Sequence, residues 1–290
     1  MRRAAGRLSR NRAAPLHARF TDLDPGDQPQ FAQSDDKQFV TALARGLDVL
    51  RAFSEGAALL GNQEIAAITR LPKPTVSRLT YTLARLGFLD YEARLGKYRP
   101  GLAGLALGYN ALRSLPVRRV AQPLMQELAR TAGVTVSLIV RDRLDVMFIE
   151  QCGNDADSAF RRDLGARLPV TSTGMARCLI VGLPRPERLY VLEHLERRHP
   201  HEWPRMEKEI YQALAEYQRL GFTICDGDGA HQMASVGLPL AAQDASRVMA
   251  LNCSAPEFRV PRERLIAEVG PRLLEMEGRV RQSLAALTGS

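Results

Sequence analysis

The segment from residue 62 to residue 86 constrains the fold of this chain more than any other. Apolar residues recur at helical spacing on both sides of a tight connection at residues 70–73. The first helix is expected to begin with Asn62 as its N-cap, and Pro74 stands where the first turn of a second helix tolerates proline. Gly87 marks the end of that second helix. Two short helices joined so closely predict a helix-turn-helix unit.

The second helix of this unit, residues 74–86, divides into two faces. The residues spaced to pack inward are Val76, Leu79, Leu83 and Leu86. The residues expected to project outward are Thr75, Ser77, Arg78, Tyr81, Thr82 and Arg85. A DNA-recognition helix needs this division, because its exposed face must offer donors and acceptors to base edges and phosphates. An ordinary amphipathic helix of a three-helix bundle is divided in the same way, so the pattern alone leaves both interpretations open.

Two short strands are predicted at residues 88–91 and 97–99, with Gly96 in the turn between them. Positive side chains near this turn would lie along DNA and complete a winged helix-turn-helix. The expected base contacts are Thr75, Ser77, Arg78 and Tyr81, and the expected phosphate contacts are Lys73, Arg85, Arg94 and Lys97. Gln63, in the first helix, completes the set of candidate DNA-binding residues.

The positive charge lies almost entirely in the first part of the chain. The formal net charge is +8. Residues 1–116 hold 17 Lys and Arg against 10 Asp and Glu, a net of +7, and the remainder holds 23 against 22, a net of +1. This asymmetry fits a nucleic-acid-binding module joined to a neutral domain. Six arginines belong to residues 1–37, which are predicted to form a disordered basic tail, so a solvated tail explains the charge equally well.

Beyond the wing, the pattern predicts a linker helix over residues 102–113 and a second domain that begins with a helix at Pro116. This second domain mixes strands and helices, which indicates an α+β fold with antiparallel hairpins. The expected strands are 134–140, 146–152, 222–226, 234–240 and 247–253, and the expected helices are 174–183, 186–197, 204–220 and 261–287. Gly270-Pro271 is expected to bend the last helix.

Hydropathy and cysteine usage exclude several classes of protein. No window approaches 18 uninterrupted apolar residues, which excludes a membrane-spanning helix. The arginine-rich N-terminus lacks an apolar core, so secretion is not expected. The cysteines form no CxxC pair and are expected to be reduced thiols in the cytoplasm, with no metal site and no cofactor: Cys152, Cys178, Cys225 and Cys253.

Residues 165–177 form the second informative stretch. Hydroxyl residues and Gly174 lead directly into an apolar helix that starts at Met175. Backbone N–H groups at such a helix start, with neighbouring hydroxyls, can hold a carboxylate. On the residues alone, simple capping of the helix by Ser172 or Thr173 is the favoured explanation. Arg177 either pairs with a ligand carboxylate or faces solvent or a partner subunit.

Several separate motifs, in order, resemble the IclR family of bacterial transcriptional regulators. They are ALARGLDVL at 42–50, EIA at 64–66, LPKPTVSRL at 71–79, LGFL at 86–89 and YRPG at 98–101. The resemblance runs from about residue 40 to the C-terminus. It implies a winged helix-turn-helix domain over 38–100, a linker helix over 101–115 and a GAF/PAS-like effector-binding and oligomerisation domain over 116–290. Members bind a DNA operator as dimers or pairs of dimers.

The resemblance also implies an effector pocket. Gly174 and Met175, next to Thr173, fall on the pocket positions that open a helix, and Asn252 and Ser254 fall on those of a later strand. In the stretch 221–240, Cys225 stands where an aspartate is common and Ser235 where a cysteine is common. These residues look closer to the subgroup that controls protocatechuate, 4-hydroxybenzoate and β-ketoadipate metabolism. The implied effector is an aromatic or dicarboxylic acid.

Two other functions compete with a ligand-responsive regulator. Cys225, Asp226 and His231 are close in sequence, and a Cys–His pair can serve nucleophilic catalysis in a small hydrolase. No nucleophile elbow, phosphate loop or His-x-x-x-His spacing accompanies them, so an enzyme is not expected. A second domain that only oligomerises remains an open alternative.

Overall fold

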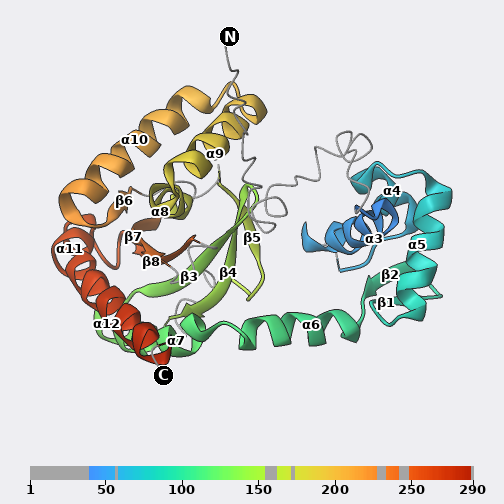
Figure 1. The fold of residues 1–290 in the computed structure, drawn as a ribbon, viewed down its shortest axis with the longest axis horizontal. Coiled ribbons are helices and arrows are strands. Elements are labelled where there is room, and N and C mark those ends of the chain that lie inside the picture. The colour runs from blue at the N-terminus through green and yellow to red at the C-terminus, as the bar shows by residue number, and fades with distance from the viewer. Residues whose placement is uncertain are drawn as a thin grey trace, which may run out of the picture.

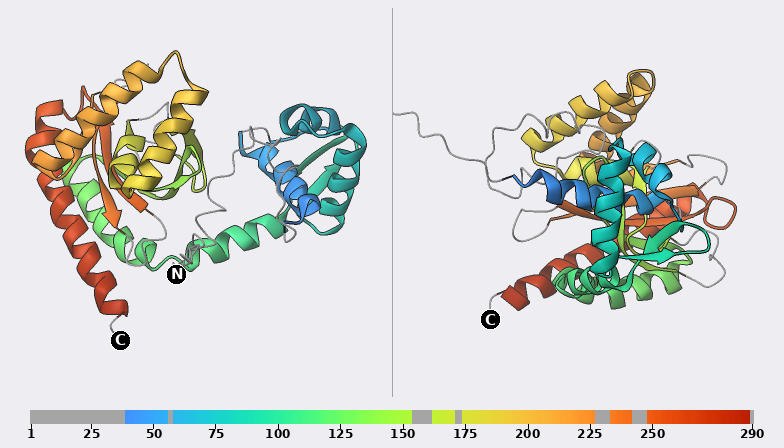
Figure 2. Two further views of the ribbon diagram at one scale, coloured as in Figure 1. Left: turned by 45° about the horizontal axis from the view of Figure 1, so that its top comes forward. Right: turned by 90° about the vertical axis from the view of Figure 1, so that its right-hand side faces the viewer.

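The computed structural model describes residues 39–55, 58–153, 162–170, 174–226, 233–241 and 248–288. The basic tail expected over residues 1–37 lies outside them. The described residues form a small helical body with a two-stranded wing and a larger body built on a sheet, and one long helix connects the two (Figure 1). The turned views of Figure 2 show the same separation of the two bodies. Among the described residues, no helix combines the length and hydropathy needed to cross a membrane.

The first body contains the predicted helix-turn-helix and its wing. Its elements are α3 (Thr41–Arg51) with a 3-10 turn at Ala52–Glu55, α4 (Asn62–Thr69), α5 (Lys73–Arg85), β1 (Leu89–Glu92) and β2 (Lys97–Pro100). One residue from each packed element is completely or almost completely buried: Val49, Ile65, Val76 and Leu89. The two strands pair antiparallel around Gly96, which has a φ of +63°. Both the helix-turn-helix and the wing are therefore confirmed.

Two local expectations about this body are wrong. Asn62 is the first residue of α4 and not its cap; Gly61 takes that position, and its N–H donates to Glu64 Oε2 at 2.6 Å. Leu86 is 62% exposed, because α5 ends at Arg85 and Leu86 follows as its C-cap. The inward position belongs to Thr80 instead, which is fully buried and donates to Asn62 Oδ1 at 3.0 Å. This hydrogen bond joins the two helices of the unit.

The connection between the bodies is α6 (Leu102–Arg113), followed by α7 (Pro116–Ala132), as predicted. No residue of α6 is buried, although the helix is rich in leucine. Gly87, with a φ of +75°, and Gly101 shape the joint between α5, the wing and α6. A Cβ on Gly101 would lie 2.3 Å from the carbonyl oxygen of Gly87, so only glycine fits there.

Six strands among the described residues form one antiparallel sheet, in the order β5-β4-β3-β8-β7-β6. The predicted strands are present as β3 (Thr135–Asp142), β4 (Asp145–Cys152), β6 (Thr223–Cys225), β7 (Met233–Ala241) and β8 (Val248–Pro256). The edge strand β5 (Arg167–Pro169) was not expected, because three residues are too few to show an alternating pattern.

Helices cover both faces of this sheet. On one face, α7 and the terminal helix α12 (Gly270–Thr288) enclose a core that includes Val136, Leu138 and Leu251. On the other face, α8 (Met175–Gly182), α9 (Arg185–Arg198) and α10 (Trp203–Leu220) enclose a core that includes Ile139 and Phe148. The α+β fold class is confirmed, with a helix-turn-helix region followed by a curved antiparallel sheet domain (Figure 1).

The terminal helix departs from α geometry near the predicted bend. A short α11 (Arg262–Arg264) runs into a π-helical turn at Leu265–Val269, and α12 begins at Gly270. Pro271 has no N–H to give to the preceding turn, so a widened turn at this point accommodates it. A Cβ on Gly270 would lie 2.4 Å from the Phe222 ring, so glycine lets the helix approach the start of β6.

Candidate DNA-binding surface and effector site

The outward face of α5 presents most of the side chains expected to contact DNA. Ser77, Arg78 and Arg85 are exposed, and Tyr81 is 65% exposed. Thr75 is half-buried at the margin of the face. Lys73 is exposed in the first turn, and Gln63 is exposed on α4. The helix lies at the outer edge of the first body, on the side away from the sheet (Figure 1). A long polar face that stands clear of the rest of the chain suits insertion into a major groove.

The two wing residues expected to contact phosphates have different surroundings. Arg94 is exposed near the turn. Lys97 Nζ instead lies 3.0 Å from Glu64 Oε1 on α4. The Gly61 N–H bond, followed by the bond from Lys97, holds the pKa of Glu64 below its ordinary value. Glu64 is therefore ionised at neutral pH, and Lys97 must share its charge between Glu64 and any phosphate.

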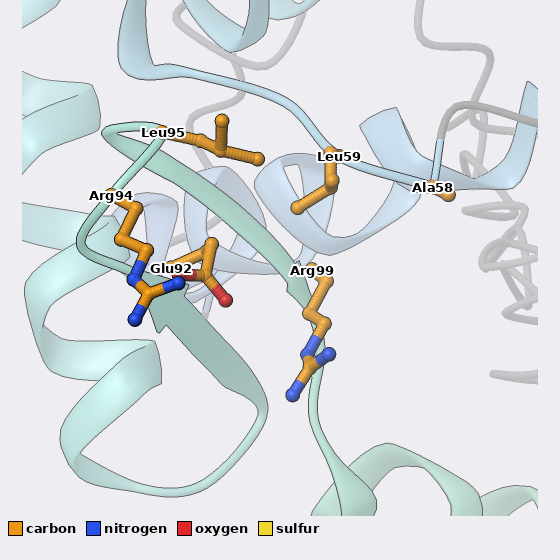
Figure 3. Close-up of a pocket in the computed structure, with 6 residues that line it drawn as sticks. All are labelled: Ala58, Leu59, Glu92, Arg94, Leu95 and Arg99. Carbon is orange, nitrogen blue, oxygen red and sulfur yellow. The ribbon is translucent and has the colours of Figure 1, made fainter.

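A groove of about 470 Å³ lies between the wing and the segment that precedes α4 (Figure 3). Sequence reasoning did not find it, because its lining comes from two segments more than 30 residues apart. Arg99 Nε lies 3.6 Å from Asp90 Oδ2 on the facing strand, so one of its two arginines already has an anionic neighbour. The lining residues are Ala58, Leu59, Glu92, Arg94, Leu95 and Arg99.

In the second body, strand register gathers polar side chains into two adjacent rows on the α8 face of the sheet. The first row, from β4 to β6, is Gln151, Ser137, Asn252, Gly237 and Thr223. The second row, from β3 to β6, is Thr135, Ser254, Ser235 and Cys225. Residues two apart on a strand share a face, so both rows face the same way. Four of the expected effector residues therefore lie together: Cys225, Ser235, Asn252 and Ser254.

The start of α8 lies directly against this polar face. A Cβ on Gly174 would lie 1.7 Å from Cys225 Sγ, so only glycine allows the helix to begin there. Met175 follows as the first helical residue and is half-buried against the neighbouring core. Thr173 and Ser172 fall outside the described residues, so the capping explanation stays a prediction. Gly174 and Met175 thus join the set that the fold brings together.

Arg177 pairs with an acidic residue of its own chain. Its Nη2 lies 2.6 Å from Glu209 Oε2 on α10, and its Nη1 lies 3.7 Å from Cys225 Sγ. Glu209 Oε1 also lies 3.0 Å from Arg205 Nη1. The Arg177 side chain is only 15% exposed, so it does not face open solvent. Glu209 already neutralises its charge.

The chemistry around the cysteines does not assemble a nucleophile. Cys225 Sγ donates to Asp226 O at 3.5 Å, and the Asp226 carboxylate pairs with Arg262. His231 lies outside the described residues. Burial raises the pKa of Cys178 to about 12 and also raises the pKa of Cys253. Among the described residues, no group of three or more His, Cys, Asp and Glu side chains is arranged to hold a metal ion.

Sequence reasoning missed two further polar groups in the sheet. Gln151 Nε2 donates to Ser137 Oγ at 3.0 Å, and its Oε1 accepts from the N–H of Arg162 at 2.7 Å. On the opposite face, Glu150 Oε2 lies 2.8 Å from Arg118 Nη2 in the first turn of α7. The only sequence signal for these pairs was the sequence EQ within the predicted strand 146–152.

Comparison with known proteins agrees with this arrangement. Residues 42–93 match the IclR helix-turn-helix domain, and residues 109–280 match the bacterial transcriptional regulator IclR C-terminal domain. The regulator TsaQ1/TsaQ2 of Comamonas testosteroni is 32% identical over 250 residues, 86% of this chain and 90% of the relative. The Pca regulon regulatory protein of Pseudomonas putida is 26% identical over 246 residues, 82% of each chain.

A crystal structure of an IclR family regulator from Brucella abortus has the same fold. It matches with a TM-score of 0.79 and 41% sequence identity, and the match covers 86% of this chain and 94% of that one. This chain belongs to the IclR family of DNA-binding transcriptional regulators and is not an enzyme.

Proposed function

We propose that the chain is a ligand-responsive regulator whose effector is a small carboxylic acid, aromatic or dicarboxylic, bound on the α8 face of the sheet. The observation that carries this proposal is the double row of polar side chains at the start of α8. Each buried polar group needs a partner, and the hydrogen bonds within the protein leave the Asn252 amide oxygen on this face without one. A polar ligand is such a partner.

The start of α8 is the position proposed for the acid group. First-turn N–H groups and the helix dipole favour an anion there, and Gly174 keeps the approach free of a side chain. Ser235 and Ser254 supply hydroxyl donors in the adjacent row. Because Glu209 already neutralises Arg177, the acid depends mainly on neutral donors. The regulated genes would then belong to a catabolic operon, in line with the subgroup resemblance and with a relative that regulates the Pca regulon.

On DNA, the proposed base contacts are Thr75, Ser77, Arg78 and Tyr81, and the proposed phosphate contacts are Lys73, Arg85, Arg94 and Lys97, with Gln63 beside them. Exposure supports these roles for most of the set. The fit of Thr75 and Lys97 depends on small local adjustments, because Thr75 is half-buried and Lys97 is paired with Glu64. Such a regulator acts in the cytoplasm, where its operator lies.

The two sites are proposed to communicate through strand β4 and helix α7. Gln151 faces the effector side, and its chain neighbour Glu150 faces the other side and pairs with Arg118. Arg118 stands in the first turn of α7, five residues after Arg113, the last residue of the linker helix α6. A ligand that prefers one position of β4 would shift α7 and α6, and with them the spacing of two recognition helices.

Two experiments on the full-length protein test the two sites. Genomic DNA of the source organism is sheared, and the fragments bound by the full-length protein are sequenced. The Arg78→Ala variant is expected to lose these fragments.

Thermal shift with a panel of aromatic and dicarboxylic acids then identifies effectors, since a ligand that binds the native state raises the melting temperature. Ser235→Leu should abolish that shift and keep the bound fragments. Enrichment of the same fragments by Arg78→Ala would contradict the DNA role, and no shift with any acid would favour a second domain that only oligomerises.

A further inference from the structure

The polar row that crosses the sheet from β4 to β6 is almost completely paired within the protein. Gln151 donates to Ser137 Oγ at 3.0 Å and accepts from the backbone N–H of Arg162 at 2.7 Å. At the other end, Thr223 Oγ1 donates to the carbonyl oxygen of Gly237 at 3.0 Å. Both ends of the row are therefore satisfied without a ligand.

Asn252, at the centre of the row, is different. Its side chain is only 1% exposed, and its Oδ1 is buried with no hydrogen-bond partner. Its Nδ2 and Cys178 Sγ of α8 both lie 3.0 Å from the position that a Cβ on Gly237 would occupy. The amide therefore lies between the sheet and α8, on the face proposed for the effector. A buried acceptor left without a donor destabilises the folded state, so a ligand group that donates to it gains binding free energy.

We propose that Asn252 determines the specificity of the effector site, and that its Oδ1 accepts a hydrogen bond from an O–H or N–H group of the effector. The inference rests on the proposed acid effector and adds a second functional group to it. An ionised carboxylate has only acceptor oxygens, so it cannot be the group that donates to Asn252 Oδ1. The effector is thus a hydroxy- or amino-substituted acid, with the substituent directed to Asn252 and the acid group toward the start of α8.

The test compares matched acids on the full-length protein at one pH and salt concentration. The probes are 4-hydroxybenzoate, 4-aminobenzoate, benzoate and 4-methoxybenzoate, with malate and succinate as an aliphatic pair. A methoxy group keeps the size and the oxygen of the hydroxyl but cannot donate. Calorimetric titration should show that a donor-bearing acid binds at least about tenfold more tightly than its partners that lack a donor, because a site built around a hydrogen bond rejects an analogue without one.

Variants separate recognition from a structural role. Asn252→Leu removes the acceptor and keeps the approximate size, so the donor-bearing acid should fall to the affinity of the parent acid. The unliganded variant should melt at or above the wild-type temperature, because no intramolecular hydrogen bond is lost. Gln282→Leu makes the same kind of change at an exposed position of α12 and should leave all affinities unchanged.

The outcomes are distinguishable. Equal binding of the methoxy and hydroxy acids by the wild-type protein overturns the role of Asn252 and leaves the acid effector in place, and this comparison needs no variant to fold. Retention of the preference in Asn252→Leu overturns it as well. If no acid of either kind binds, the proposed effector class fails and this inference fails with it.

Discussion

Arg177 Nη2 lies 2.6 Å from Glu209 Oε2, so α8, the helix that begins at the proposed effector site, is held to α10 by an ion pair on its outer side. The pair is mostly enclosed, with 15% and 25% of the two side chains exposed. Arg205 shares the other oxygen of Glu209 at 3.0 Å from a far more exposed position. Glu209 thus holds two arginines, and the polar face beneath α8 is left with neutral donors and acceptors.

Glu209→Gln should destabilise the protein by about 1–2 kcal/mol. The change keeps the shape of the side chain but leaves the Arg177 guanidinium partly enclosed without its counter-charge, and removing one partner of a buried pair is costly. The measurement is urea unfolding at neutral pH. Arg205→Gln is the matched control: because Arg205 is 57% exposed, its loss should cost under about 0.5 kcal/mol. Equal effects of the two changes would contradict an enclosed Arg177 pair.

Gly174→Ala should destabilise the second body, by about 1–3 kcal/mol. The φ of Gly174 is −61°, which alanine adopts freely, so the cost arises from contact alone. The new Cβ would lie 1.7 Å from Cys225 Sγ. Adding Cys225→Ala to it removes the sulfur and should recover part of the loss in urea unfolding. Gly278→Ala, in α12 with no atom within 4 Å of the added carbon, should instead leave stability unchanged or slightly raised.

Local sequence patterns predict most of the helices and strands of this fold. The predictions that fail concern residues whose burial depends on where a helix ends or on a neighbouring element. Helical spacing identified α5 because Val76, Leu79 and Leu83 do pack inward, whereas Leu86 lies past the last turn and is exposed. Thr80 was assigned to neither predicted face of the helix; it is buried, and its hydroxyl donates to Asn62, a partner that only the packed helix pair supplies. A buried polar residue is recognised from its hydrogen-bond partner in the folded structure, and the spacing of residues along the sequence does not show that partner.

The proposed effector site could be predicted only through family resemblance. Residues of five strands form its polar face, and the register that aligns Ser137 with Asn252 is a long-range property. Arg177 illustrates the same limit: the sequence offers it to a ligand, whereas Glu209, 32 residues further along, already pairs with it. The unpaired Oδ1 of Asn252 also required the packed structure, since burial and the absence of a partner are both properties of the folded state.

Removing one partner of the Arg118–Glu150 pair should lower the free energy of unfolding by about 2–4 kcal/mol. Glu150 is 6% exposed as a side chain, so Arg118→Met leaves a buried carboxylate without its cation. The double variant Arg118→Met with Glu150→Leu should be close to the wild type or more stable, because both charges are then removed. Urea unfolding of the wild type and of the two variants measures this. A double variant as unstable as the single one would show that the pair has no coupling of its own.

Glu64→Gln should strengthen binding to a random-sequence duplex about two- to fivefold at fixed salt. The pKa of Glu64 is lowered in the folded state, so its charge persists at neutral pH and competes with phosphates for Lys97. Glutamine keeps an oxygen to accept the N–H of Gly61, so α4 should still begin correctly. Fluorescence anisotropy provides the measurement, with Glu196→Gln on α9 as the control. Unchanged affinity would mean that Lys97 does not approach the phosphate backbone of the DNA.

Leu105→Glu should lower the mass of the assembly that the protein forms in solution. Leu102, Leu105, Leu107 and Tyr109 of α6 are between 58% and 78% exposed, an apolar surface that a free helix does not favour in water. We expect a second copy of the chain to cover it, as the family's binding to DNA in pairs implies. Light scattering measures the mass, and Leu189→Glu, at a 55% exposed position of α9, is the control. If the wild type is a monomer, or if both variants keep the wild-type mass, α6 is not the contact between copies.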